Sequence, residues 1–93
     1  MTIRTRKLDT MPYAQAQVEF DGYTFILRSY NTIVLELDLD GWLKCNGLYS
    51  ATTRKHISAF MREYTKHDYY FAKKAYEGGY IINIHTGEVK QYA

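Results

Sequence analysis

Apolar and polar residues alternate over residues 13–47, which is the pattern of β-strands with one buried face. One strand is expected to end at Phe20, and two more strands cover 23–29 and 32–39. The Asp21-Gly22 pair predicts a two-residue hairpin turn, because both residue types tolerate positive φ. The apolar pairs on one face are then Phe20 with Tyr23, Val18 with Phe25 and Ala16 with Leu27.

The second hairpin turn decides which residues share the core face of the sheet. A two-residue Asp40-Gly41 turn would mix apolar and charged side chains on one face. A three-residue loop over 39–41, with a left-handed glycine and a bulge, instead pairs Leu35 with Cys45. We therefore expect the three-residue loop, with Cys45 as a small buried hydrophobe rather than a nucleophile.

From Ser50 onward the apolar period changes to that of a helix. Ser50 or Thr52 is expected to cap this helix, because a hydroxyl there accepts a hydrogen bond from a free backbone N–H group. Apolar side chains then recur every three or four residues and predict one buried stripe. The stripe consists of Thr53, Ile57, Phe60, Met61 and Tyr64.

The chain continues with a second helix and two strands. Asp68 is expected to cap a shorter helix that runs to about Tyr76 and is ended by Gly78-Gly79. Strands over 80–84 and 89–92 follow. The resulting order, ββββααββ, is typical of an α+β fold in which two helices pack on one face of an antiparallel sheet.

A length of 93 residues suits one domain. Pro12 is the only proline, and we expect it to end a flexible N-terminal arm, 1–11, before a single α+β domain over 12–93. No apolar run reaches the roughly 18 residues of a membrane span, and the N-terminus lacks the apolar segment of a secretory signal. The single cysteine excludes an internal disulfide and is typical of a reducing, cytoplasmic setting.

Ten tyrosines raise the aromatic content to 16%. Aromatic side chains bury much area in a small core, and tyrosine is also enriched at interfaces. The net charge of +2 hides an uneven distribution. Residues 8–40 hold six acidic residues against one basic residue, and residues 41–80 hold seven basic residues against three acidic ones. We therefore expect separate acidic and basic surfaces.

The helical region supplies a candidate basic face, which would bind phosphates. Tyr69, Tyr70 and Tyr76 would add stacking against single-stranded bases. The alternative is a solvated helix surface with no partner. The six basic residues are Arg54, Lys55, Arg62 and Lys66, joined by Lys73 and Lys74 on the second helix.

An acidic ladder is the second candidate surface. Glu36, Asp38 and Asp40 alternate along one strand, so they share a face at a spacing of about 6.6–7 Å. Glu19 and Asp21 extend the row from another strand. Such a ladder would imitate the phosphates of a nucleic acid, although a solvated sheet face is again the alternative.

The sequence argues against catalysis and against a metal site. His56 and His67 are eleven residues apart, which matches no compact ligand spacing. A Cys–His dyad would need an exposed Cys45, whereas we expect a core cysteine and surface histidines, His85 included. No P-loop, dinucleotide fingerprint or nucleophile elbow occurs. We expect no enzymatic activity, no cofactor and no metal.

Two segments resemble a motif of small uncharacterised proteins from bacteriophages and mobile elements. In that motif a Ser-Tyr-x-Thr strand, here 29–32, precedes Tyr-Ser-x-Thr-Thr-x-x-His at the start of a helix, here 49–56, with Phe60 further along. The resemblance covers about residues 29–62. Its hydroxyl-rich helix start either caps the helix only or also binds a phosphate.

The resemblance implies a small phage-type accessory protein that acts by binding in the cytoplasm of a host bacterium. The leading hypothesis is an inhibitor of a host factor, such as a nucleic-acid-handling defence complex, in the manner of anti-CRISPR proteins. Its partner would be a host protein or a protein–nucleic-acid complex, with no membrane involved. The alternatives are a nucleic-acid-binding accessory protein that uses the basic helix face, and a small assembly protein that self-associates.

Overall fold

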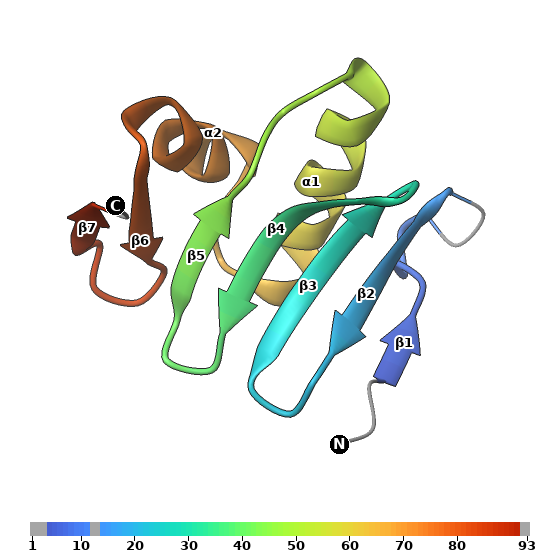
Figure 1. Ribbon diagram of the computed structural model, residues 1–93, viewed down its shortest axis with the longest axis horizontal. Helices are drawn as coiled ribbons and strands as arrows, with labels where there is room; N and C mark the ends of the chain where they lie inside the picture. Colours follow the sequence, from blue (N-terminus) through green and yellow to red (C-terminus); the bar gives the residue numbers. More distant parts are fainter. Residues whose placement is uncertain (1–3, 12–13, 92–93) are drawn as a thin grey trace.

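In the part of the chain that the structure describes, seven strands form one antiparallel sheet, and each strand pairs with the strands before and after it in the chain. The structure is a computed structural model that describes residues 4–11 and 14–91. Two helices cover one face of the sheet, so the predicted α+β class is confirmed (Figure 1). The strands are β1 (Arg4–Arg6), β2 (Ala16–Phe20), β3 (Thr24–Ser29), β4 (Thr32–Asp38), β5 (Trp42–Cys45), β6 (Tyr80–Asn83) and β7 (Val89–Gln91); the helices are α1 (Ala51–Tyr64) and α2 (Tyr69–Gly78).

The hairpin between β4 and β5 has the predicted register. Leu35 lies opposite Cys45, and Leu37 lies opposite Leu43. Gly41 adopts the left-handed conformation, with φ of 94°, that the three-residue loop requires. Apolar side chains therefore stay on the core face of both strands, and Cys45 is buried as expected.

The hairpin between β2 and β3 differs from the prediction by two residues. Phe20 lies opposite Phe25 rather than Tyr23. The Asp21 carboxylate accepts hydrogen bonds from the backbone N–H groups of Tyr23 and Thr24, which closes a longer turn. Because a shift of two residues preserves the faces of a strand, Val18, Phe25 and Leu27 still point to the core, whereas Tyr23, predicted on the same face, lies in the turn and is exposed.

A β-bulge interrupts the pairing of β3 with β4. Leu27 pairs with Leu35 and Arg28 pairs with Ile33, so Val34 is an extra residue in β4. The bulge lets the adjacent residues Val34 and Leu35 both be buried, which strict alternation would forbid. It lies just before Ser29, whose side chain contacts α1.

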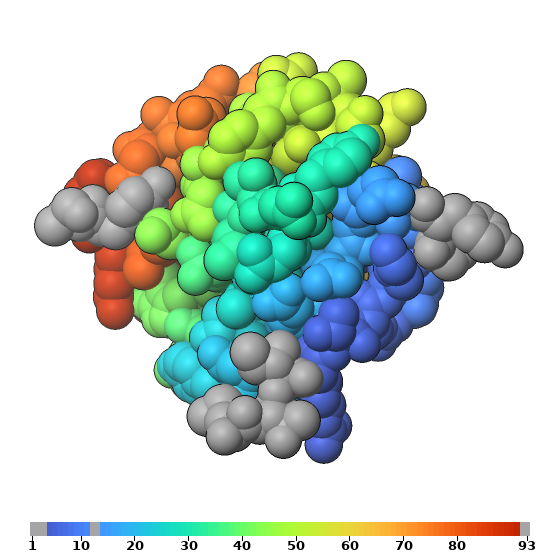
Figure 2. Space-filling model, turned by 45° about the vertical axis from the view of Figure 1, so that its right-hand side comes forward, coloured from blue at the N-terminus to red at the C-terminus, as the bar shows by residue number. Residues whose placement is uncertain are grey.

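The N-terminal segment is the main departure from the prediction. Instead of forming an arm, residues 4–6 are strand β1 on the edge of the sheet, beside β2 (Figures 1 and 2). Leu8 is completely buried. The Glu63 carboxylate on α1 accepts hydrogen bonds from the backbone N–H groups of Asp9 and Thr10 and from the Thr10 hydroxyl. The described residues before Pro12 are thus part of the domain.

Both helices begin at the expected caps, and α2 ends at the expected glycines. Ser50, rather than Thr52, caps α1 by accepting from the Thr53 N–H. Asp68 caps α2 in the same way, and Gly79 ends it in the left-handed conformation. The last two strands agree with the predicted ranges to within one residue. Tyr92, the predicted end of the last strand, lies outside the described residues.

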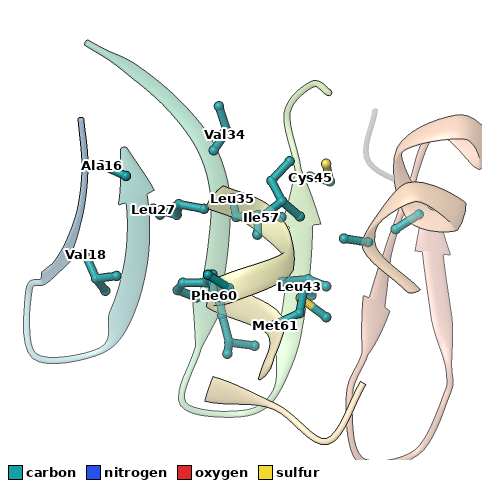
Figure 3. Close-up of a cluster of buried hydrophobic side chains, with 14 of the residues drawn as sticks. Ala16, Val18, Leu27, Val34, Leu35, Leu43, Cys45, Ile57, Phe60 and Met61 are labelled. Atoms are coloured by element: carbon teal, nitrogen blue, oxygen red, sulfur yellow. The ribbon is translucent and has the colours of Figure 1, made fainter. Parts of the chain in front are cut away.

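The core lies between α1 and the centre of the sheet. Side chains from the strands point toward Ile57, Phe60 and Met61 of α1 (Figure 3). Helix α2 contributes the small residues Ala72 and Ala75, which let it approach β5 and β6 closely. The predicted α1 stripe is therefore confirmed, with Tyr64 half-buried at its end.

The position of Leu8 gives a direct test of whether the N-terminal segment belongs to the core. We expect Leu8→Ala to lower the free energy of unfolding by about 2–5 kcal/mol, because it removes a fully buried side chain. The matched control is Leu39→Ala, since Leu39 is 56% exposed and its truncation leaves no cavity. Urea denaturation measures both. Equal, small effects of the two substitutions would mean that this segment does not pack.

Candidate functional site

The residues of the motif meet where the end of β3 reaches the start of α1. The Ser29 hydroxyl oxygen lies 2.8 Å from His56 Nδ1 and 3.4 Å from the Thr53 hydroxyl. The Thr53 hydroxyl in turn lies 3.3 Å from that of Ser50. Ser29, Thr53 and His56 are each at most 4% exposed. These buried polar contacts join the sheet to the first two turns of α1.

Burial of His56 contradicts the expectation of a surface histidine. Its burial lowers the pKa of the imidazole, because the charged form would lose its hydration. A serine hydroxyl beside an imidazole is also the arrangement of a nucleophile and its base. Ser29 is only 2% exposed, however, so a substrate cannot reach it in this conformation. The pair therefore acts as a structural contact.

Two exposed tyrosines flank this buried cluster. Tyr30 and Tyr49 have φ of 56° and 44°, a left-handed conformation that is uncommon for non-glycine residues. The Tyr30 ring lies 6.1 Å from the imidazole of His56, and the Tyr49 ring lies against Gly47. A Cβ atom at Gly47 would come within 2.6 Å of that ring. Both rings are thus held beside the start of α1 while more than half exposed.

The exposed side of α1 carries the α1 basic face, which we define as Arg54, Lys55 and Arg62. No carboxylate in the described part of the chain forms an ion pair with these three residues. Glu63 is the one acidic residue of the helix, and it is bound to the N-terminal segment. Lys66 is exposed just beyond the helix end. The basic residues that the sequence analysis singled out on this helix, Arg54, Lys55 and Arg62, are all exposed.

A groove runs along the α1 basic face. Lys55, Ser58 and Arg62 line one side, and Thr10 and Met11 of the N-terminal segment line the other. The groove has a volume of about 260 Å³. Its two sides are held together by the hydrogen bonds to Glu63 described above. The N-terminal segment thus completes a surface that the helix alone would not form.

The candidate residues on α2 do not form one continuous surface with the α1 basic face. Lys73 is half-buried, with its ammonium nitrogen 5.9 Å from the ring centre of Tyr70. Lys74, Tyr70 and Tyr76 are exposed. Tyr69 packs against the core, so it is a packing residue rather than the predicted contact residue. The three aromatic candidates are therefore divided between the core and the surface.

The acidic ladder is largely occupied by contacts within the protein. Glu36 lies opposite Lys44 and accepts a hydrogen bond from the Asn46 side chain. Asp38 accepts from the N–H groups of Asp40 and Trp42 and thereby shapes the hairpin loop. These bonds leave fewer free acceptor positions for an outside partner.

The remaining carboxylates of the row are engaged as well. Glu19 forms an ion pair of 2.8 Å with Arg28, which lowers the pKa of Glu19. Asp21 closes the β2–β3 turn, and its bonds to backbone N–H groups lower its pKa. Asp40 accepts from the Tyr23 hydroxyl and raises the pKa of Tyr23 to about 12. The fold therefore does not expose a continuous row of free carboxylates.

The remaining candidates for chemistry are structural or isolated. Burial raises the pKa of Cys45 to about 11, so its thiol stays protonated and unreactive. His67 contacts the backbone oxygen of Ile84 at 2.7 Å and stacks on Phe71. Among residues 4–11 and 14–91, no group of three or more His, Cys, Asp or Glu side chains is placed to hold a metal ion. No helix in these ranges is long and apolar enough to cross a membrane.

The fold and its surfaces define a small α+β domain that exposes one basic helix beside two constrained tyrosines. The chain belongs to DUF8033, a family of unknown function, whose model matches residues 2–78. The matched range contains β1 to β5, both helices and every motif residue. No curated protein and no solved structure matches the chain.

Burial of His56 predicts a loss of stability in mild acid. The pKa of His56 is lowered from its ordinary value of 6.5 in the folded protein, so the unfolded chain takes up a proton more readily. Stability is then fully present above about pH 6.5 and is lost as the pH falls below it. Urea denaturation at about pH 7.5 and about pH 5.5 measures this loss. Both pH values lie above the range in which the carboxylates titrate.

The matched pair of variants is His56→Gln and His85→Gln, since His85 is exposed. His56→Gln is expected to reduce the difference in stability between the two pH values, whatever its effect at neutral pH. His85→Gln is expected to leave that difference unchanged. The same pH difference in both variants would show that His56 is not the titrating group.

Proposed function

We propose that this protein is a non-enzymatic accessory protein that binds nucleic acid through the α1 basic face. The observation that carries the proposal is that Arg54, Lys55 and Arg62 are exposed on one side of a helix without an ion-pair partner among the described residues. In contrast, the carboxylates of the acidic ladder have partners inside the protein. Unpaired cations on a rigid element are suited to phosphates.

The dimensions of the helix support a polyanion as the ligand. Arg54 and Arg62 are separated by two helical turns, which is about 12 Å at a rise of about 1.5 Å per residue. That length corresponds to three or four nucleotides at the rise of about 3.4 Å per nucleotide that a strand has in a duplex, and to fewer in an extended single strand. The α1 basic face would therefore contact successive phosphates rather than a single anion.

The start of α1 adds two features suited to a single strand. The N-terminal end of a helix carries partial positive charge, which favours a phosphate nearby. Tyr30 and Tyr49 expose their rings beside it, and exposed aromatic rings stack on bases without sequence preference. We infer that the preferred ligand is single-stranded, and that the protein acts in the cytoplasm of a host bacterium as a phage-type accessory protein.

A second candidate function is the inhibition of a host factor. The observation that favours it is the uncovered face of the sheet, where Trp42 and Ile81 are half-exposed beside Glu36 and Asp38. A host protein with an apolar, basic patch would fit this face. In a pull-down with the immobilised protein, this candidate requires that a host protein stays bound after nuclease treatment. The Glu36→Lys variant is expected not to retain that host protein.

The primary proposal predicts a binding affinity that depends steeply on salt. Fluorescence anisotropy with a labelled single-stranded oligonucleotide is expected to give a slope of about −2 for log K against log salt concentration, from about three phosphate contacts. Replacing Arg54, Lys55 and Arg62 together by Gln is expected to bring the slope close to zero.

The matched control replaces Lys7, Lys74 and Lys90 by Gln. It removes the same total charge from other parts of the surface, so we expect the salt slope to stay near that of the unmodified protein. Equal loss of binding in the two triple variants would mean that net charge, rather than the α1 basic face, attracts the ligand. Unchanged binding in the first variant would exclude this face as the contact surface.

A further inference from the structure

A cavity of about 470 Å³ lies between the edge of the sheet and the end of α1, outside the α1 basic face. Val18, Phe20, Phe25 and Tyr64 form its apolar walls, and Arg4 and Arg6 line it from β1. Its volume falls in the range of about 300–1,000 Å³ that is typical of small-molecule sites. The combination of apolar walls and cationic groups at one edge suits an amphipathic ligand.

The aromatic walls of this cavity support one another. The rings of Phe20 and Phe25 are stacked with centres 4.4 Å apart, and the Phe25 ring lies 5.2 Å from that of Tyr64. The Tyr64 ring also stacks on Phe60 in the core at 4.7 Å. Rings that are packed in this way hold their positions, so the apolar part of the cavity is preformed.

The two arginines reach the cavity because of the strand register. Arg4 pairs with Phe20 and Arg6 pairs with Val18 in the β1–β2 ladder, so both arginines lie on the same face of the sheet as α1. The Arg6 guanidinium carbon lies 5.8 Å from the ring centre of Tyr64. Asp9 forms an ion pair with Arg6 at 2.6 Å. Arg4 has no such pair among the described residues, so the edge of the cavity keeps a net positive charge.

The wall also contains a polar atom that lacks a hydrogen bond. The hydroxyl oxygen of Tyr64 is buried and has no partner among the described residues. Buried hydroxyl groups in native proteins nearly always have a partner, so this one calls for an explanation. Burial raises the pKa of Tyr64, which keeps the hydroxyl protonated and able to donate. The oxygen is closed off in this conformation, so an acceptor oxygen of a ligand would reach it after a movement of the Tyr64 side chain or of the groups that cover it.

We propose that this cavity binds a small amphipathic carboxylate. The carboxylate pairs with the guanidinium groups of Arg4 and Arg6 and accepts a hydrogen bond from the Tyr64 hydroxyl. The hydrocarbon part of the ligand lies against Phe20 and Phe25. A carboxylate suits these groups because a guanidinium presents parallel N–H donors to its two oxygens. The site is independent of the proposed binding of nucleic acid.

Isothermal titration calorimetry with sodium decanoate tests the proposal, and decylammonium chloride serves as a probe of the same chain length and opposite charge. We expect saturable binding of one decanoate per chain and binding of decylammonium that is weaker by about tenfold or more. Absence of saturable decanoate binding, or equal binding of the two amphiphiles, would overturn the proposal.

Two variants locate the binding within the molecule. Arg4→Gln and Tyr64→Phe are each expected to weaken decanoate binding by about threefold or more, since each removes one donor. Their controls are Lys90→Gln, which removes one positive charge, and Tyr76→Phe, which removes one phenolic hydroxyl, both at exposed positions elsewhere. Circular dichroism checks that each variant folds. Decanoate affinity unchanged in both Arg4→Gln and Tyr64→Phe would contradict the assignment of this cavity.

Discussion

The docking of α1 on the sheet is the interaction on which the rest of the structure depends. Its apolar stripe fills the centre of the core, and polar contacts fix both of its ends. Near its start, His56 binds Ser29 at the end of β3. Near its end, Glu63 binds the backbone of Asp9 and Thr10 and so holds the N-terminal segment in place. Because its inner side is packed on the sheet, α1 exposes its outer side to a partner, and the basic residues Arg54, Lys55 and Arg62 are exposed there.

The sequence predicted the strands and helices in which one buried face makes apolar residues recur at a regular spacing. The register of β4 with β5 was predictable, because only the three-residue loop kept charges away from the core face. The register of β2 with β3 could not be predicted in this way. Two registers that differ by two residues place the strand residues on the same faces, and hydrogen bonds to the Asp21 carboxylate decide between them. Strand β1 left no apolar signal, because Arg4–Arg6 is exposed along its whole length.

The candidate surfaces differ in how far sequence could predict them. Helical spacing predicted one side for the basic residues of α1, because the angle between side chains is set locally, and Arg54, Lys55 and Arg62 are exposed. Alternation also placed Glu36 and Asp38 on one strand, but the groups that engage them come from turns and neighbouring strands, which local patterns do not reveal. The contact between Ser29 and His56 joins residues 27 positions apart, so no short-range signal predicted that His56 is buried.

The central claim is that the outer side of α1 is the contact surface. Its most direct test is a titration of isotope-labelled protein with a single-stranded oligonucleotide of about ten nucleotides, followed by amide chemical shifts. We predict progressive shifts at Arg54, Lys55 and Arg62 and at neighbouring positions on the same side of the helix. Shifts confined to the open face of the sheet, around Glu36 and Trp42, would contradict the claim and assign the binding surface to the sheet.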